Sequence, residues 1–443
     1  MLLMEPLQIA SLIILIGTVG AIIWGKIDRA AVAIFGAVLM ILVGAITEYD
    51  AFSLVDWNVI VLIISMWILA GYFGKTGIPE VLAHRAVGWS RGSVSTFMIL
   101  LGGMAGLVSL FVDNILVILI FAPVALHITR LMKTNPIPFV IFIGLCANFT
   151  GSALLIGDLP PQMLHSVSGI EFLGFIWSEG RPSSFIILMA TFAVLLALFK
   201  VKFDRMYKKD DKARDAFALI DPEGGSYLKD RKAAAIIVAF FVGTIVALSL
   251  RQYIGLQLGA IALIGAASLV LVMETLGDRV KKPSFEETLT SLDWRSVLFY
   301  IALFVLIGSI EKQGLIEMAA DALAPALVSS EAIGVSVVYW ATVPIVGVLE
   351  HDAYILAFLY LIRDLAAQGA INPWPYWWSI LWAGTLGSNL TVAGAPALLA
   401  ALNLCEKEGC KVHLRRFLGL SLPFVVISVA VCYALMMIFW VLI

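Results

Sequence analysis

Apolar stretches of about twenty residues recur along this chain and limit its fold more than any other feature. A helix needs about 20 mainly apolar residues to cross a bilayer, because lipid cannot satisfy backbone polar groups. Uninterrupted stretches occur at residues 8–24, 30–47, 58–73, 183–200, 233–250, 256–275, 297–310 and 418–441. The chain is therefore predicted to be an all-α polytopic membrane protein.

The composition excludes several classes of soluble protein. Hydrophobic residues make up 61% of the 443 residues and charged residues 14%, against about 45–50% and about 25% in soluble proteins. The net charge of −2 offers no basic surface for nucleic acid, and the four cysteines form no CxxC pair. We find no paired metal-ligand motif, no nucleophile beside a base and no phosphate-binding GxxxxGK[ST] motif. We therefore predict no enzyme activity, no cofactor, no metal and no nucleic-acid partner.

Four longer apolar runs are interrupted by polar residues. The runs at 94–130 and 331–366 are broken at Asp113-Asn114 and at Glu350-His351-Asp352. The runs at 136–170 and 374–404 are broken between Asn148 and Pro161 and around Ser388 to Pro396. We predict that the first pair forms re-entrant helical hairpins and that the second pair crosses the membrane as broken helices.

The basic residues predict an orientation. With these hairpins, 25 of the 29 basic residues fall on one side, which the positive-inside rule assigns to the cytoplasm. The inner (plasma) membrane protein then has ten crossings, and both termini are non-cytoplasmic. The charged segment 201–232 is a cytoplasmic linker, interpreted as a solvated loop with a docking site as the alternative. It separates a first membrane repeat (1–200) from a second (233–443).

An internal repeat supports this division. At an offset of 237 residues, Asp56-Trp57 matches Asp293-Trp294, Asp113 falls on Glu350, and Asn114 falls on His351. A further shift of four residues pairs Asn148-Phe149-Thr150 with Asn389-Leu390-Thr391. Five crossings per half is an odd number, so the two repeats must have opposite topologies. Inverted repeats with broken helices are typical of secondary transporters.

Ionisable residues at membrane depth are costly and are therefore functional candidates. We predict that Asp113, Asp158, Glu350 and His351 couple transport to protons, because carboxylates and a histidine can exchange protons near neutral pH. The neighbouring Asp352 has two interpretations, a functional group or a cap of the following helix.

Neutral polar groups at the breaks are predicted to bind the substrate. They are Asn114, Asn148, Thr150, Gly151, Ser152, Ser388, Asn389, Thr391 and Gly394. Such oxygens and amides suit a small cation or a neutral polyol. No Lys or Arg is predicted at depth beside the breaks, which weighs against an organic anion.

Two further expectations concern the membrane interface. Trp374, Trp377, Trp378 and Trp382 are predicted to form an interfacial belt rather than a binding site. The amphipathic segments 78–90 and 315–328 are predicted to lie in the interface.

Three motifs resemble a known group of transporters. They are the hairpin tip Leu110-Phe-Val-Asp-Asn-Ile, the stretch Ile156-Gly-Asp-Leu-Pro-Pro-Gln162, and Ser388-Asn-Leu-Thr-Val-Ala-Gly-Ala395. Over about residues 50–443 the chain resembles the ion transporter superfamily, in particular its ArsB arsenite permease and P-protein branch. The NhaD sodium/proton antiporters and the magnetosome protein MamN share the pattern.

The resemblance implies a secondary active transporter that works by an elevator motion. It implies proton-coupled efflux of arsenite or antimonite as the neutral trihydroxide, with homodimers and a soluble ATPase subunit in some members. The family's threonines after Asp-Asn are Leu116 and Val117 here, and its second Asp-Asn is Glu350-His351. These departures favour protons over a sodium site. Sodium/proton exchange of the NhaD type is the alternative, followed by carboxylate symport.

Overall fold

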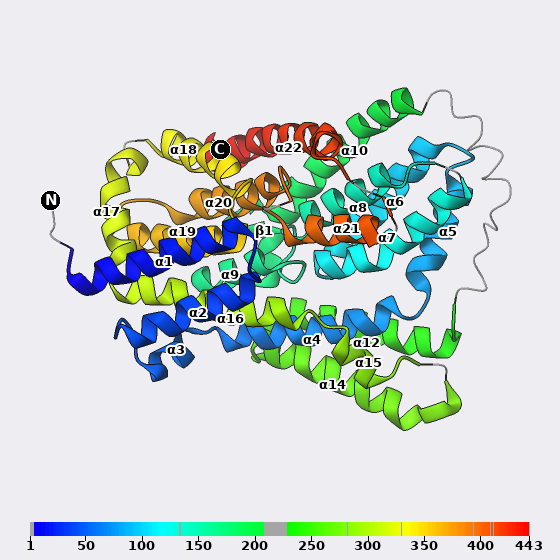
Figure 1. Cartoon of the computed structure of the whole chain (residues 1–443), viewed down its shortest axis with the longest axis horizontal. Helices are drawn as coiled ribbons and strands as arrows, with labels where there is room; N and C mark the ends of the chain where they lie inside the picture. Colours follow the sequence, from blue (N-terminus) through cyan, green and yellow to red (C-terminus); the bar gives the residue numbers. More distant parts are fainter. Residues whose placement is uncertain are drawn as a thin grey trace.

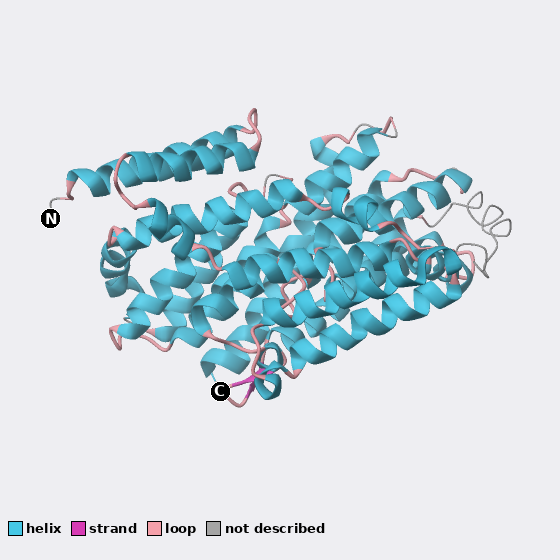
Figure 2. Cartoon of the chain, turned by 90° about the horizontal axis from the view of Figure 1, so that it is seen from below, coloured by secondary structure: helices cyan, strands magenta, loops and turns pink. Residues whose placement is uncertain are grey.

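The chain folds almost entirely into helices, as Figures 1 and 2 show. The computed structural model describes residues 4–132, 134–207, 228–280, 282–328, 330–392, 394–407, 409–410 and 412–442. Within these residues, eight helices are long and apolar enough to cross a membrane. The prediction of an all-α polytopic membrane protein is confirmed. Residues 208–227 of the predicted linker, with the Asp221-Pro222-Glu223-Gly224-Gly225 turn, lie outside the described residues.

The first half contains helices that correspond to the predicted spans, hairpin and broken helix. Its helices are α1 (Pro6–Trp24), α2 (Arg29–Leu42), α3 (Glu48–Leu54), α4 (Trp57–Gly74), α5 (Ile78–Trp89), α6 (Val94–Ser109), α7 (Asn114–Leu131), α8 (Ile137–Thr150), α9 (Leu159–Ser168) and α10 (Ser184–Met206). The short 3-10 helix η1 (Phe172–Phe175) precedes a hairpin of two antiparallel strands, β1 (Trp177–Ser178) and β2 (Arg181–Pro182). Figure 2 shows this hairpin near the end of the chain, where Trp440 Nε1 donates to Pro182 O at 2.9 Å.

The second half is also helical and contains no strand within its described residues. Its helices are α12 (Arg231–Ser249), α13 (Arg251–Ile254), α14 (Leu258–Leu276), η2 (Gly277–Arg279), α15 (Phe285–Thr290), α16 (Trp294–Lys312), α17 (Leu315–Val328), α18 (Glu331–Val346), α19 (His351–Ala367), α20 (Pro373–Ser388), α21 (Pro396–Lys407) and α22 (Leu414–Met436). A π-helical segment η3 (Met437–Leu442) continues α22.

The four interrupted apolar runs each end one helix and begin another at the polar residues where a break was predicted. In three of them the second helix begins at a carboxylate that accepts hydrogen bonds from backbone N–H groups of the first turn. Asp113 accepts from Ile115 N at 3.0 Å, Asp158 from Leu159 N at 2.9 Å, and Glu350 from Ala353 N at 3.1 Å. Carboxylates are favoured at this position because they satisfy unpaired N–H groups and face the positive end of the helix dipole. Each of these three carboxylates is therefore both a functional candidate and a helix cap.

The predicted span 30–47 is wrong at its end. Helix α2 stops at Leu42, and Gly44 adopts a left-handed φ of +79°. Fourteen residues extend about 21 Å, which is less than the roughly 30 Å of a typical hydrocarbon core. Glycine takes this conformation without the steric cost that other residues have, so it ends the helix early.

Contacts repeat between the two halves at the offset of 237. Trp57 Nε1 donates to Phe52 O at 2.9 Å, and Trp294 Nε1 donates to Leu289 O at 2.9 Å. A Cβ on Gly157 would lie 2.4 Å from Gly151 O, and one on Gly394 would lie 2.6 Å from Ser388 O. The predicted four-residue shift is kept in one pair of contacts, since Thr150 Oγ1 donates to Gly106 O and Thr391 Oγ1 donates to Gly347 O. The helix ends do not follow it, because Asn148 lies inside α8 whereas Asn389 follows the end of α20.

The halves are interlocked around their broken helices. Helix α6 packs along α8, and α18 packs along α20. The second segment of each broken helix crosses to the other half: α21 contacts α7 and α8, and α9 contacts α19 and α20. Helices α5 and α17 lie at opposite ends of the molecule in Figure 1, as inversion of one half relative to the other requires.

The predicted tryptophan belt is wrong for most of its members. Trp378 and Trp382 are fully buried, and Trp377 is 7% exposed. Trp378 stacks on Trp382 with ring centroids 5.3 Å apart, and Trp382 Nε1 donates to Ser184 Oγ at 2.8 Å. Tryptophan is found both at the membrane–water interface and in protein cores where its N–H has a hydrogen-bond partner. The tryptophans of α20 therefore did not by themselves indicate which of these two environments they occupy.

Candidate functional site

A chain of side-chain amides links the two broken helices. Asn148 Nδ2 donates to Ser388 Oγ at 3.0 Å and to Asn389 Oδ1 at 3.2 Å. On its other side, Asn148 Oδ1 accepts from Asn114 Nδ2 at 2.8 Å. Asn114 Nδ2 also donates to Asp158 Oδ2 at 2.9 Å. The structure thus brings five predicted site residues from both halves into one buried network.

The tip of the first hairpin faces the first broken helix across a small hollow. Asp113 and Asp158 line it together with Gln162 and Tyr300, and its volume is about 10 Å³. This is space for about one water molecule. Gln162 Oε1 is buried and receives no hydrogen bond within the described part of the chain, so it could accept a hydrogen bond from a bound water.

The second hairpin tip holds three buried acceptor atoms that receive no hydrogen bond from the residues that the structure describes. They are Glu350 Oε1, His351 Nε2 and Asp352 Oδ1. His351 Nδ1 lies 2.9 Å from Gly394 O. A carbonyl oxygen only accepts, so Nδ1 carries the hydrogen and Nε2 of the neutral ring is a second acceptor. Nε2 lies 3.4 Å from Asp352 Oδ1, and two acceptors at this distance need a shared proton or a cation.

These three side chains are also close enough to ligate one cation, since their ligand atoms lie within 4.8 Å of one another. Two features oppose a resident metal ion. The N-terminus of α19 presents the positive end of its dipole. Arg29 Nη1 lies 3.7 Å from Glu350 Oε1. Both features make the cluster a poorer site for a cation.

Arg29 corrects the prediction that no basic side chain lies beside the breaks. It is the first residue of α2, and Asp28 caps that helix through the N–H groups of Ala30 and Ala31. The guanidinium reaches inward, donates to Ser296 Oγ at 3.0 Å and lies 4.8 Å from the ring centroid of Phe299. Part of the argument against an organic anion is thereby removed.

Arg29 and Glu350 lie in the wall of a cavity of about 630 Å³. Its lining comes from the end of α1 and the segment that leads into α2, from the start of α16, from α7, from the second hairpin tip and from α21. A pocket of this size takes a small organic molecule. The cavity adjoins the site.

The hydroxyl groups of two predicted site residues hold helices together. Thr150 Oγ1 donates to Gly106 O at 2.7 Å, and Thr391 Oγ1 donates to Gly347 O at 2.5 Å. Ser152 Oγ and Thr385 Oγ1 lie 2.5 Å apart and join α20 to the break after α8. These three predicted residues position the break, while Asn114, Asn148, Ser388 and Asn389 form the polar network itself.

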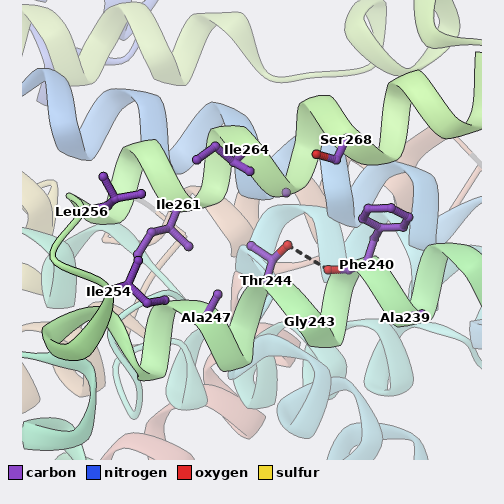
Figure 3. Close-up of a pocket in the computed structure, with 11 residues that line it drawn as sticks. Ala239, Phe240, Gly243, Thr244, Ala247, Ile254, Leu256, Ile261, Ile264 and Ser268 are labelled. Carbon is purple, nitrogen blue, oxygen red and sulfur yellow. Dashed lines mark hydrogen bonds between the residues drawn. The ribbon is translucent and has the colours of Figure 1, made fainter.

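A second large pocket lies apart from these residues. It is a groove of about 520 Å³ between α12 and α14, lined by apolar and small side chains around Thr244 (Figure 3). Thr244 Oγ1 donates to Phe240 O at 2.8 Å within its own helix. Since the groove contains no predicted site residue, we do not assign the transport site to it.

Sequence reasoning missed several residues of the site. Tyr300 lies in an apolar span and gave no signal. Gln162 was visible as a departure from the family motif, and Asp352 was left open. Arg29 was among the 25 basic residues assigned to the cytoplasmic side, although Asp28 before an apolar run is a signal for a helix start that could have placed it on α2.

Broken, interlocked helices in an apolar bundle, with buried proton acceptors where they meet, define a polytopic secondary transporter. The comparisons with known proteins give its family. The model of the family described as CitMHS, citrate transporter, matches residues 19–383. The chain belongs to this family of transporters.

Similar proteins span nearly the whole chain. An uncharacterized transporter of Mycobacterium tuberculosis is 27% identical over 415 residues, which cover 91% of this chain and 92% of the relative. The 46 kDa membrane protein of Mycobacterium leprae is 24% identical, with 96% and 97% covered. The P protein of Mus musculus is 23% identical, and the match spans 97% of this chain and 60% of the P protein. Membership of the ArsB branch stays a prediction.

The glycines at the breaks give a first test of the site. A Cβ on Gly394 would lie 2.4 Å from Val346 O, so Gly394→Ala must shift backbone. We expect a stability loss of about 1–3 kcal/mol, typical of overpacking, and strongly reduced transport. Gly103→Ala is the control, because its Cβ would meet Leu196 at an ordinary 3.6 Å. Equal melting temperatures of both variants in detergent would contradict the tight contact.

Proposed function

We propose that this protein is a proton-coupled secondary transporter of a small organic anion with carboxylate groups. The observation that carries the proposal is the ion pair of Arg29 with Glu350 in the wall of the 630 Å³ cavity. Guanidinium groups bind carboxylates with two parallel hydrogen bonds. The name of the family, citrate transporter, agrees with this substrate class.

Protons are the proposed coupling ions. Asp158 and Asp113 line the hollow at the first hairpin tip, and Glu350, His351 and Asp352 cluster at the second. Acceptors that face one another in an apolar bundle repel unless a proton or a cation lies between them, because unpaired buried charges are costly. The repeat-related contacts support two inverted repeats, which would expose these tips alternately as one body moves. In the orientation predicted from the basic residues, the cavity faces the cytoplasm.

Proton-coupled arsenite efflux is the second candidate. It is favoured by the neutral network of Asn148, Asn389 and Ser388, in which amides and a hydroxyl could bind a trihydroxide without a charged partner. The same neutral oxygens would be required for sodium/proton exchange of the NhaD type. A homodimer and a soluble ATPase subunit remain proposals that belong to this arsenite reading.

Uptake into proteoliposomes separates the candidates. Purified protein is reconstituted, a pH gradient is imposed, and labelled citrate, arsenite and sodium are offered separately. We expect gradient-driven, saturable citrate movement that collapses with a protonophore. Movement of arsenite without citrate would support metalloid efflux, and collapse of the pH gradient by sodium alone would support exchange. Protein-free liposomes are the control for leakage.

A further inference from the structure

The charges in the 630 Å³ cavity balance only while Glu350 is ionised. Three basic residues, Lys26, Arg29 and Arg295, line it together with three acidic residues, Asp28, Asp293 and Glu350. Arg295 pairs with Asp28 at 3.7 Å, and Lys26 lies over the ring of Trp24 at 4.8 Å. A proton on Glu350 would therefore leave one net positive charge in the cavity, next to Arg29.

Glu350 is placed to compete with a substrate for Arg29. Its side chain is 8% exposed and that of Arg29 is 24% exposed, so the pair lies at the boundary between the cavity and the protein interior. The separation of 3.7 Å is an ion pair but not a hydrogen bond, and Glu350 Oε1 accepts none from any described residue. Arg29 meanwhile bonds Ser296 Oγ, which in turn donates to Asp293 Oδ2 at 2.6 Å. The guanidinium is thus held in position while its pairing with Glu350 stays loose.

We propose that Arg29 binds a carboxylate group of the transported anion and that Glu350 takes its place when the anion is absent. This inference rests on the proposed function and names the subsite that would carry it. A proton on Glu350 frees Arg29 to bind the anion, and an anion on Arg29 favours protonation of Glu350. Binding of the proton and binding of the anion therefore strengthen each other. Such reciprocity follows from thermodynamic linkage between two sites.

Several other charged groups face Glu350 and affect the linkage. Asp293 and Arg295 approach from the start of α16, and Lys26 and Asp28 from the segment before α2. His351 and Asp352 lie on its own helix, and Asp158 lies within electrostatic reach from α9. Among the cavity's acids, Glu350 is the one that pairs with Arg29, whereas Asp28 pairs with Arg295 and Asp293 accepts from Ser296.

The test measures citrate affinity at an acidic and at an alkaline pH, as KM in proteoliposomes and as thermal stabilisation of purified protein in detergent. In Arg29→Gln we expect affinity to fall about 10-fold to 100-fold at both pH values, the loss of one charge-assisted contact. Arg29→Lys should restore part of it. The Glu350→Gln variant should bind citrate more tightly at alkaline pH than the wild type does, even if its transport is lost. The pH dependence of its citrate affinity should be only that of the ionisation of citrate itself.

Arg251→Gln is the matched control. Arg251 is ion-paired with Glu171 and is 23% exposed, but it lies outside the cavity, so its loss should leave citrate affinity unchanged. Normal citrate affinity in Arg29→Gln, in a protein whose wild type transports citrate, would overturn the subsite while the proposed function stands. Failure of the wild type to bind or move citrate would overturn both.

Discussion

Asp158→Asn is expected to reduce transport driven by a pH gradient by about 100-fold or more, a typical effect of losing a group that transfers protons. Asparagine cannot carry the proton, yet it caps a helix as well as aspartate does. Its side-chain oxygen can still accept from Asn114 Nδ2, which donates to Asp158 at 2.9 Å. The variant should therefore fold, and exchange of labelled for unlabelled citrate at equal pH should persist.

The comparison of the two assays tests the assignment. Loss of gradient-driven uptake with retained exchange identifies Asp158 as a proton carrier, whereas loss of both would indicate a role in binding. Asp204→Asn is the control, because Asp204 lies near the end of α10 and pairs with Lys200 and Ser95. Wild-type gradient-driven uptake in Asp158→Asn would remove this residue from the proton path.

Asn148→Leu is expected to cause the largest loss of stability. Leucine is similar in size, but it lacks the amide nitrogen that donates to Asn389 Oδ1 at 3.2 Å. It also lacks the amide oxygen that accepts from Asn114 Nδ2. Each unsatisfied buried group costs about 1–3 kcal/mol, so a total of roughly 3 kcal/mol is expected. Transport should fall below detection, since the network joins both broken helices. The measurements are the melting temperature in detergent and citrate uptake.

Ser309→Ala provides the comparison for a buried polar group outside the network. Ser309 is fully buried, and its hydroxyl donates to Val305 O within α16 at 2.6 Å. The loss should stay within about 1 kcal/mol, because the change removes only the hydroxyl donor and Val305 O still accepts the backbone N–H four residues later in α16. If both variants melted at the same temperature, the amide network would not be the link between the halves.

The interruptions of the fold were predictable because they are local. Asp, Asn, Gly and Pro inside apolar runs mark places where a helix must end, and the structure breaks at Asp113, Asp158, Glu350 and Asn389 as expected. The meeting of Asn148 with Asn389 was not predictable in detail. The sequence match suggested equivalent positions in the two halves, but it gave no sign that the two side chains would form a hydrogen bond with each other.

Long-range packing explains what the sequence did not reveal. Arg29 looked like one of many basic residues at a membrane surface, and its partner Ser296 lies 267 residues further along the chain. The buried tryptophans of α20 were misplaced for a similar reason, because their surroundings come from distant helices such as α10. Residue type alone could not separate a lipid-facing position from a position against another helix.

The amide network also bears on how the protein is made. Asn148 donates to the backbone of Thr385, which is synthesised 237 residues later. At about 5–20 residues per second, the ribosome needs on the order of 10–50 s to cover this distance. During that interval the polar break of the first half lies in the bilayer without its final partners. The nascent chain therefore depends on its insertion machinery, or on neighbouring water, to shelter Asn148 until α20 arrives.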